Sequence, residues 1–340
     1  MNYYIKIFSN KPKEDINDIV ERMGYRNLAP NCTRNAGWAH FAVKLGALFG
    51  ILWRMRRGDI LLIQYPMKKF VTPAILCAHL KRARVVVLIH DLGCFRRKKL
   101  TVEHEMRRMN RADYIIAHNP SMQAFMQKNG CTTPIATLGI FDYLSPSTPS
   151  TYATPHRPWR VLYAGGLGYW RNPFLYELDA HIDGWQLELY GKQFDAERAV
   201  GWQHIHFNGQ LPPDELIASA EGDFGLVWDG GSLDECNGDW GEYLRVNNPH
   251  KTSFYLRARV PIIIWRHAAL APFILEHGVG IAVDKLTDIN TELAHMTPET
   301  YAQMRENARR LGDQLDAGHF TQTALTLAEQ SLSATTKQLH

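Results

Sequence analysis

A short polar segment in the second half of the chain, Asn248-Pro249-His250-Lys251, has the residue types of an anion-binding helix start. Asn is a favoured helix N-cap and Pro is tolerated at the first helical position, so the pair predicts a helix that begins here. The N–H groups at a helix N-terminus attract anions, and the charge of Lys251 adds to this attraction. The segment predicts a phosphate site; the alternative is an ordinary capped helix with a surface lysine.

A glycine-rich turn follows a predicted strand at 160–164. Gly165 and Gly166 allow the backbone to approach a ligand closely. The Gly-Gly-x-Gly spacing lacks the gap before the third glycine of the dinucleotide fingerprint, which argues against an NAD(P) oxidoreductase. Arg171, at the end of the turn, is a candidate bidentate partner for phosphate. The alternative is a tight turn with an exposed arginine.

An indole and a carboxylate stand at the end of the apolar strand at 225–228. Trp228 could stack on a base, and Asp229 could accept hydrogen bonds from ribose or sugar hydroxyls. The alternative is a core tryptophan with the aspartate in a turn. The acidic residues of 232–240 have no histidine or second spaced carboxylate to complete a ligand set, so we expect no metal site.

His90 and Asp91 follow another apolar strand, at 85–90, in the first half of the chain. A doubly wound domain carries its chemistry at such strand ends. Asp91 could accept the proton of an attacking hydroxyl and His90 could contact a transferred group; alternatively, Asp91 caps the following helix. Asn119-Pro120 is ordinary helix-start chemistry, and we expect Asn119 to act as a cap.

The elements that must position these residues alternate between strand and helix in both halves, which predicts two mostly parallel, doubly wound α/β sheets. Four prolines in residues 145–158 predict a linker. The resulting domains are 1–150, 151–315 and a helical tail at 316–340 that crosses back to the first domain. The last helical tract, 298–330, is expected to be interrupted near Gly312 and Gly318. Ligands of such folds bind at strand C-terminal ends, here in a cleft between the domains.

The charge is divided between the halves. Residues 1–150 hold 23 Lys and Arg against 10 Asp and Glu, a net +13, whereas residues 151–340 have a net −9. Basic clusters at 54–57, 68–69, 81–84 and 96–99 lie among Trp53, Phe70 and Phe95, a mixture that favours an anionic membrane surface. No nucleic-acid-binding motif accompanies the charge, so nucleic acid is not expected. A solvated basic surface is the remaining alternative.

The cellular setting follows from the apolar runs and the cysteines. No run approaches the roughly 20 residues of a membrane span and no signal peptide precedes the first strand, so we expect a cytoplasmic protein, peripheral at the inner face of the cell membrane. Five scattered cysteines without a CxxC pair predict free thiols rather than disulfides or a zinc ribbon.

Several of these segments together resemble a bacterial glycosyltransferase family. It includes the O-antigen β-1,6-galactofuranosyltransferases of enteric bacteria and the streptococcal glucosyltransferases that extend GlcNAc on serine-rich adhesins. The likeness covers most of the chain, from about residue 60 to residue 275. The matching segments are 88–91, 117–120, 140–144, 163–165, 225–230, 243–256 and 264–271.

The resemblance implies a GT-B fold, a UDP-sugar donor bound mainly by the C-terminal domain, no cofactor and no catalytic metal. It places the donor diphosphate at Arg171, Asn248 and Lys251, and it makes Tyr243 of the matched segment a further donor contact. Gly166 stands where the family's turn has Asn. The chain also lacks the pair of Glu seven residues apart of many retaining GT-B enzymes, so their ribose contacts do not transfer.

The sequence therefore predicts a metal-independent hexosyltransferase of surface polysaccharide, O-antigen or lipopolysaccharide synthesis. It would move a hexose, with galactofuranose favoured, from a UDP-sugar to a glycan acceptor that is lipid-linked. One alternative is a glucosyltransferase that acts on a GlcNAc-modified glycoprotein or glycolipid. A second alternative is a non-catalytic sugar-nucleotide-binding partner subunit. The sugar, the stereochemical course and homo-oligomer formation are left open.

Overall fold

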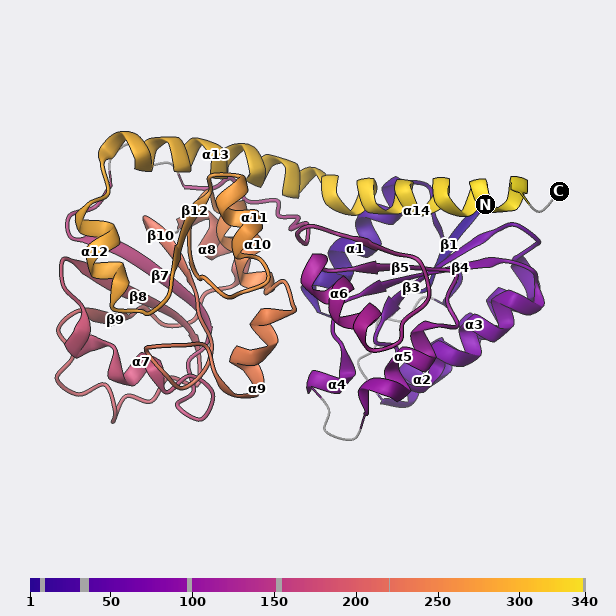
Figure 1. Cartoon of the computed structure of the whole chain (residues 1–340), viewed down its shortest axis with the longest axis horizontal. Helices are drawn as coiled ribbons and strands as arrows, with labels where there is room; N and C mark the ends of the chain where they lie inside the picture. Colours follow the sequence, from indigo (N-terminus) through magenta and orange to yellow (C-terminus); the bar gives the residue numbers. More distant parts are fainter. Residues whose placement is uncertain (7–9, 31–36, 97–99, 151–154, 220, 339–340) are drawn as a thin grey trace. The chain divides into compact units, whose positions relative to one another are not determined.

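The structure, a computed structural model, describes residues 1–6, 10–30, 37–96, 100–150, 155–219 and 221–338 (Figure 1). It divides into two compact units, Met1–Asp142 together with Gly318–His340, and Tyr143–Ala317. The first unit thus combines the N-terminal residues with the C-terminal helix.

The chain changes unit at Asp142–Tyr143, before the proline-rich residues 145–158 where the sequence predicted the boundary. The Arg257 guanidinium explains the difference. It donates to the carbonyl oxygens of Ser145 and Ser147 at 2.8 and 2.9 Å, which fixes the start of the predicted linker to the second unit. Residues 151–154 of the linker lie outside the described residues, and the return to the first unit begins at Gly318 rather than at 316.

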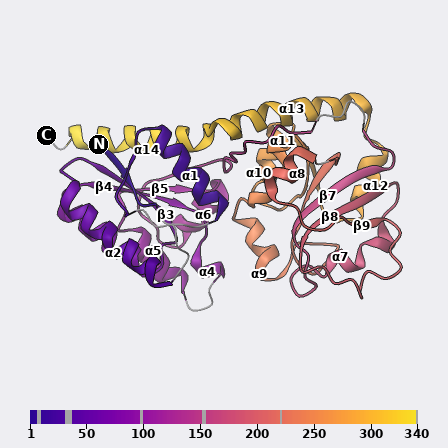
Figure 2. The ribbon, with the colours of Figure 1, turned by 180° about the vertical axis from the view of Figure 1, so that it is seen from behind.

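The first unit holds a parallel sheet in the order β2-β1-β3-β4-β5-β6. Side chains alternate between its faces. Leu62, Leu88 and Ile116 pack with α1 and α14 on one face, while α2 and α3 lie on the other (Figures 1 and 2). The strands are β1 (Asn2–Tyr4), β2 (Arg26–Asn27), β3 (Ile60–Tyr65), β4 (Arg84–Ile89), β5 (Tyr114–Ala117) and β6 (Ile135–Thr137); the helices are α1 (Lys11–Arg22), α2 (Gly37–Arg54), α3 (Val71–Leu80), α4 (Gly93–Arg96), α5 (Val102–Met109), α6 (Pro120–Lys128) and α14 (His319–Gln338).

Helix α2 was not predicted from the sequence. Its apolar residues are not confined to one face, so the sequence lacks the polar face of an amphipathic helix, and Gly46 and Gly50 are poor helix formers. Both glycines serve close packing: a Cβ at Gly46 would lie 2.6 Å from the Pro30 ring, and one at Gly50 would lie 2.6 Å from the Leu28 carbonyl oxygen. Tertiary packing therefore overrides the weak local preference.

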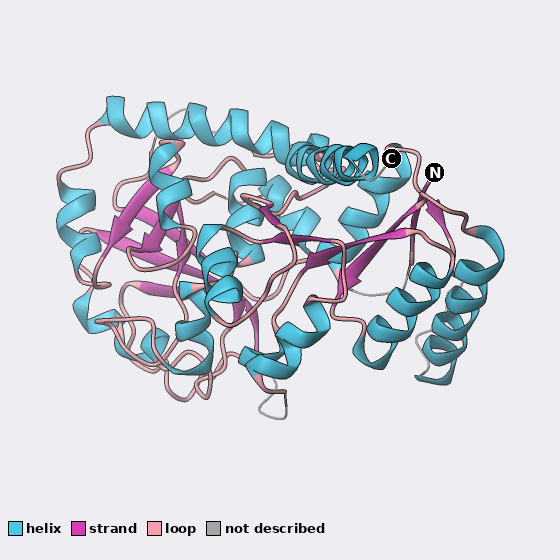
Figure 3. Ribbon diagram, turned by 45° about the vertical axis from the view of Figure 1, so that its right-hand side comes forward, coloured by secondary structure: helices cyan, strands magenta, loops and turns pink. Residues whose placement is uncertain are grey.

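The second unit holds another parallel sheet, in the order β12-β11-β10-β7-β8-β9, with helices around it (Figure 3). Its central strands are buried on both sides, which explains their continuous apolar sequences. The strands are β7 (Trp159–Gly166), β8 (Trp185–Lys192), β9 (Ile205–Phe207), β10 (Phe224–Val227), β11 (Ile262–Trp265) and β12 (Gly280–Val283); the helices are α7 (Phe174–Glu177), α8 (Pro213–Ser219), α9 (Gly238–Gly241), α10 (His250–Arg257), α11 (Ala271–Glu276), α12 (Asp288–Ala294) and α13 (Pro298–Ala317).

The interruption predicted near Gly312 is wrong, because α13 runs through this residue. A Cβ at Gly312 would lie 2.4 Å from the Leu256 carbonyl oxygen, so the glycine lets α13 pack closely on α10. The break occurs at Gly318, whose φ of 75° is a left-handed conformation that glycine adopts without strain.

Two parallel sheets flanked by helices confirm the predicted α/β class with two doubly wound units. Among the described residues, no helix has the length and apolar content needed to cross a membrane. Cys77, Cys94, Cys131 and Cys236 are free thiols, and Cys32 lies outside the described residues.

Candidate functional site

The helix expected at Asn248-Pro249 begins one residue later than predicted. Pro249 is the N-cap of α10, with φ −68° and ψ 127°. The N-cap position predicted at Asn248 is therefore wrong by one residue. A residue that precedes proline is restricted to extended backbone, and the Asn248 side chain is buried. The start of the helix still brings His250 and Lys251 to a pocket.

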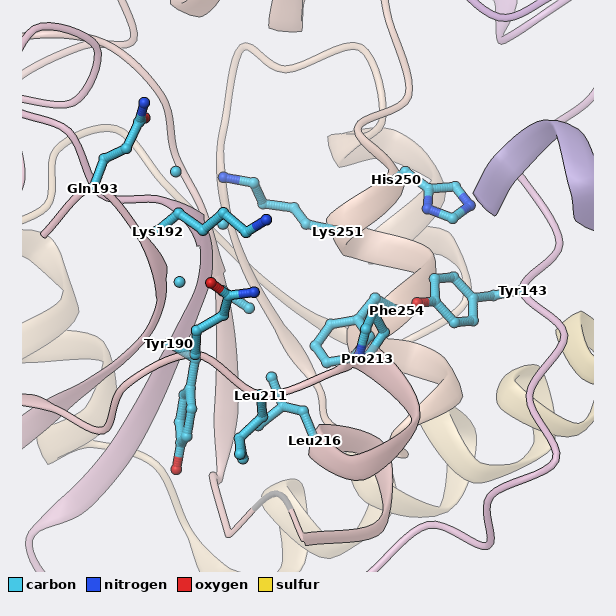
Figure 4. Close-up of a pocket in the computed structure, with 15 residues that line it drawn as sticks. Tyr143, Tyr190, Lys192, Gln193, Leu211, Pro213, Leu216, His250, Lys251 and Phe254 are labelled. Carbon is cyan, nitrogen blue, oxygen red and sulfur yellow. The ribbon is translucent and has the colours of Figure 1, made fainter. Parts of the chain in front are cut away.

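This pocket lies within the second unit, at the C-terminal ends of β7 and β8 and the N-terminus of α10, and has a volume of about 620 Å³. Lys192 from β8 and Lys251 from α10 extend into it from opposite sides (Figure 4). Its other walls are mainly aromatic and aliphatic, with two glutamines. They include Tyr143, Tyr190, Gln193, Gln210, Leu211, Pro213, Leu216, His250 and Phe254.

The predicted glycines Gly165 and Gly166 line this pocket, as does Gly191 of the neighbouring strand. Gly165 and Gly191 are register partners, and a Cβ at Gly191 would lie 1.8 Å from the Gly165 carbonyl oxygen. The two strand ends can approach this closely only because Gly191 lacks a side chain. Gln193, next along the wall, has a φ of 66°, a strained conformation typical of binding sites.

The second feature of the site is a cluster of three charges from three elements. The Asp229 carboxylate, after β10, lies 3.2 Å from Arg171 Nη2 and 3.4 Å from Lys251 Nζ. Lys251 also donates to the Tyr163 hydroxyl at 3.2 Å. The Arg171 guanidinium stacks on the Trp240 ring, 4.1 Å from its centre. The sequence predicted each charged residue separately, and the structure brings them together with Asp229 as the shared counter-ion.

Burial lowers the pKa of Lys251, and the Asp229 carboxylate acts in the opposite direction. A buried ammonium gains when an anion approaches, because an opposite charge favours the charged form. An anion placed beside Lys251 would therefore favour the charged form of its ammonium group.

Two predicted donor contacts are buried in the structure. Trp228 has no exposed surface, packs against Trp265 and donates from Nε1 to the Ser232 carbonyl oxygen at 3.0 Å. This is the core role that the sequence left as the alternative to stacking on a base. Tyr243 is 3% exposed and lies in a 3-10 turn at Glu242–Arg245. Neither side chain offers a surface to a ligand in this structure.

In the first unit, His90 and Asp91 follow β4 as predicted, and both are partly exposed. His90 Nε2 is 2.8 Å from Gln64 Oε1 of β3, and its ring stacks on Phe141 with centres 5.3 Å apart. The imidazole is therefore held in place while Asp91 remains accessible.

The helix start predicted at Asn119 is also present. Asn119 caps α6 by accepting from the Met122 N–H at 2.9 Å, which confirms that prediction.

Two residues that sequence analysis did not single out support the segment around Asp91. The buried carboxylate of Glu105 accepts from the Gly93 and Cys94 N–H groups at 2.6 and 2.8 Å, which anchors the segment at α4. Lys13 donates to the Pro66 carbonyl oxygen at 2.9 Å. Burial lowers the pKa of Lys13 to about 8, against the opposing effect of the Asp91 carboxylate. Asp91 thus has a cationic neighbour that titrates near neutrality.

Some of the pocket residues that were not predicted follow a pattern that could have identified them. Lys192 and Gln193 stand at the end of a strand, as do His90 and Asp91. Tyr143 and Phe254 carry no such signal, since aromatic side chains are ordinary core residues.

Among the described residues, no group of three or more His, Cys, Asp or Glu side chains could hold a metal ion.

Known proteins resemble the chain along most of its length. The family model described as glucosyltransferase 3-like, N-terminal domain, matches residues 6–140, and the C-terminal domain model matches residues 161–328. The chain is 31% identical to the beta-1,6-galactofuranosyltransferase WbbI of Escherichia coli over 320 residues, or 93% of this chain and 92% of the relative. Identity to glucosyltransferase 3 of Streptococcus gordonii is 24%, over 82% of this chain and 81% of the relative.

Solved structures show the same fold at low sequence identity. Sucrose-phosphate synthase from Thermosynechococcus elongatus matches with a TM-score of 0.62 and 13% identity, over 98% of this chain and 99% of that chain. The lipopolysaccharide outer core galactosyltransferase WaaB matches with a TM-score of 0.60 and 12% identity, over 96% and 99%. The fold is therefore GT-B, and with both family models matched, the chain belongs to the glucosyltransferase 3-like family of glycosyltransferases.

Proposed function

We propose that this hexosyltransferase uses a UDP-sugar, with galactofuranose favoured as the transferred hexose, and adds it to a glycan acceptor of surface polysaccharide synthesis. The observation that carries the proposal is the pocket at Lys251, beside the Arg171–Asp229 pair. The 31% identity to a galactofuranosyltransferase supports the choice of sugar.

The pocket suits the two chemical parts of a nucleoside diphosphate. Its volume of about 620 Å³ lies in the usual range for small-molecule sites. Tyr190 and Leu216 provide an apolar surface for a base, while Lys192 and Lys251 provide positive charge for a diphosphate. The N-terminus of α10 adds its partial positive charge at the same place.

The chemistry follows from where charge develops. As the glycosidic bond to the donor breaks, negative charge grows on the departing UDP. Lys251 and Arg171 stabilise that charge electrostatically, which lowers the barrier most when the cations are already held in position. Asp91 of the first unit accepts the proton of the acceptor hydroxyl, and His90 contacts the transferred sugar.

The remaining parts of the proposal concern the acceptor and the setting. The net +13 of residues 1–150 supports a lipid-linked acceptor at an anionic membrane surface, with the enzyme peripheral to the inner face of the cell membrane. Of the basic clusters, residues 97–99 lie outside the described residues. Transfer of glucose is the second candidate, because the chain is 24% identical to a glucosyltransferase.

A panel of UDP-sugars that includes UDP-galactofuranose and UDP-glucose, each with lipid-linked and synthetic acceptors, tests the proposal. We expect UDP release to depend on acceptor and to be fastest with UDP-galactofuranose. Faster turnover of UDP-glucose would overturn the choice of sugar. Tight UDP binding without turnover of any donor would instead support a non-catalytic partner subunit, and absence of UDP binding would overturn the donor site.

A further inference from the structure

The least expected feature of the first unit is the outer face of α2. Its exposed apolar side chains follow helical spacing, and Trp53 is 91% exposed. A surface helix of a globular protein normally carries polar residues on this face. The exposed residues are Phe41, Leu45, Phe49, Leu52 and Trp53.

The opposite face of the same helix accounts for its packing. Val43, Ala47 and Ile51 are four residues apart and buried, with exposed fractions of 6%, 1% and 0%. The helix is thus held in the unit by one stripe while the second stripe remains uncovered. The neighbouring helix α3 (Figure 1) also carries exposed leucines, Leu76 and Leu80.

The contrast with the rest of the described surface makes this patch informative. Apart from the adjacent pair Tyr169 and Trp170, the exposed large apolar residues of the second unit, such as Val200 and Leu275, are scattered along the sequence, which is normal for soluble proteins. A contiguous apolar patch marks an interaction site. Beside Phe49 and Trp53 there is also an apolar groove of about 430 Å³, lined in part by Leu28.

Charge identifies the partner. Residues 22–58 contain seven Lys and Arg and no Asp or Glu, and Arg54, Arg56 and Arg57 are exposed at the end of α2. A second copy docked symmetrically on this face would bring these like charges together. An anionic lipid surface complements both properties, because aromatic side chains enter the boundary between headgroups and acyl chains while arginines meet the headgroups.

We propose that the outer face of α2 inserts into anionic lipid membranes, with Phe49 and Trp53 as its main apolar anchors and Arg54, Arg56 and Arg57 as its headgroup contacts. This proposal deepens the proposed function by assigning its membrane contact to a defined helix face. It places apolar insertion, rather than charge alone, at the centre of binding.

Sedimentation with phosphatidylcholine vesicles, with and without phosphatidylglycerol, tests the proposal. We expect binding to the anionic vesicles, with part of it retained at about 1 M salt, where the Debye length is about 3 Å. The double variant Phe49→Ser, Trp53→Ser should bind at least about tenfold more weakly, since each buried apolar side chain contributes strongly to transfer. Val200→Ser, an equally exposed apolar position of the second unit, is the matched control.

Further readouts separate the alternatives. Replacing Arg54, Arg56 and Arg57 by Gln should weaken binding at low salt by at least about tenfold and leave the salt-resistant part. UDP affinity and melting temperature should not change in any of these variants. A parent protein that binds vesicles but does not bind UDP would count against the proposed function and leave the lipid proposal standing. Vesicle binding that survives the Phe49 and Trp53 double change, or a parent dimer that this change dissociates, would overturn the lipid proposal.

Discussion

The C-terminal edges of the two sheets have the same architecture and carry different chemistry. In the second unit, Arg171 and Lys251 converge on one buried carboxylate beside a pocket. In the first unit, His90 is held by an uncharged amide, and Asp91 remains partly exposed. This difference supports the proposal that one edge holds an anion and the other moves a proton.

The comparison shows that a shared fold fixes where chemistry takes place without fixing which chemistry it is. Both edges collect the polar residues that follow parallel strands. The difference lies in the counter-charges. Asp229 compensates its two cations before any donor arrives, whereas the cationic neighbour of Asp91 is a lysine whose pKa is about 8. Variants that affect one edge alone test this division of roles.

The largest expected effect is on turnover through Asp91. Asp91→Asn removes the proposed base, and we expect turnover to fall by about 10²- to 10⁴-fold, the usual contribution of general base catalysis. UDP affinity, measured by calorimetry, should stay within about twofold of the parent value, since binding belongs to the other unit. Asp18→Asn, at an exposed position of α1, is the matched control. An equal loss of UDP affinity in Asp91→Asn would contradict the division.

The next largest effect is on donor binding through Lys251. A charge-assisted hydrogen bond contributes about 1.5–3 kcal/mol, so Lys251→Ala should weaken UDP binding by about 10- to 150-fold. Turnover should fall at least as far, because charge on the departing group grows in the transition state. Arg171→Ala should behave likewise, and Lys285→Ala, an exposed lysine of the same unit, should have no effect. If Lys251→Ala binds UDP as tightly as the parent does, the proposal that Lys251 binds the diphosphate is wrong.

A smaller effect, of opposite sign, is expected at Asp229. The ion pairs that Asp229 forms compete with phosphate, and a partly exposed pair contributes about 1 kcal/mol. Asp229→Asn should therefore bind UDP about fivefold more tightly at a pH low enough to keep Lys251 charged. The carboxylate raises the pKa of Lys251 against burial, so its removal lowers that pKa further. As the pH rises, Lys251 should lose its proton at a lower pH in the variant than in the parent. The gain in UDP affinity should therefore disappear before the UDP affinity of the parent begins to fall.

The same variant distinguishes the counter-ion from a ribose contact. If Asp229 accepts hydrogen bonds from ribose hydroxyls, as the sequence suggested, Asp229→Asn will bind UDP more weakly at every pH. Binding of inorganic pyrophosphate, which has no ribose, provides the control because only the counter-ion role affects it.

The smallest expected effect is that of chelation. Cationic side chains and the start of α10 provide positive charge for the diphosphate, so UDP affinity should change by less than about twofold when EDTA is added. Calorimetry with and without added Mg²⁺ measures this directly. A marked loss of affinity on chelation would show that a divalent metal contributes to the second unit's edge.

The sequence by itself determined the parallel α/β class, the strand-end positions of His90, Asp91 and Asp229, and the glycine turn at Gly165. These features depend on local signals, namely apolar runs of strand length, alternation with helices and residues that permit tight turns. The N-terminal caps were only partly predictable. Asn119 occupies its predicted N-cap position, whereas Asn248 lies one residue before the N-cap of α10.

Only the tertiary structure decided which of these residues meet. The pairing of Asp229 with two cations depends on the order of β7, β10 and α10 in space, which no local pattern encodes. The same is true of the burial of Trp228, the pocket wall at Tyr143 and the uncovered face of α2. Sequence periodicity reports whether a residue suits an interior, but strand order and packing determine what lies against it, because the contacting atoms come from distant parts of the chain.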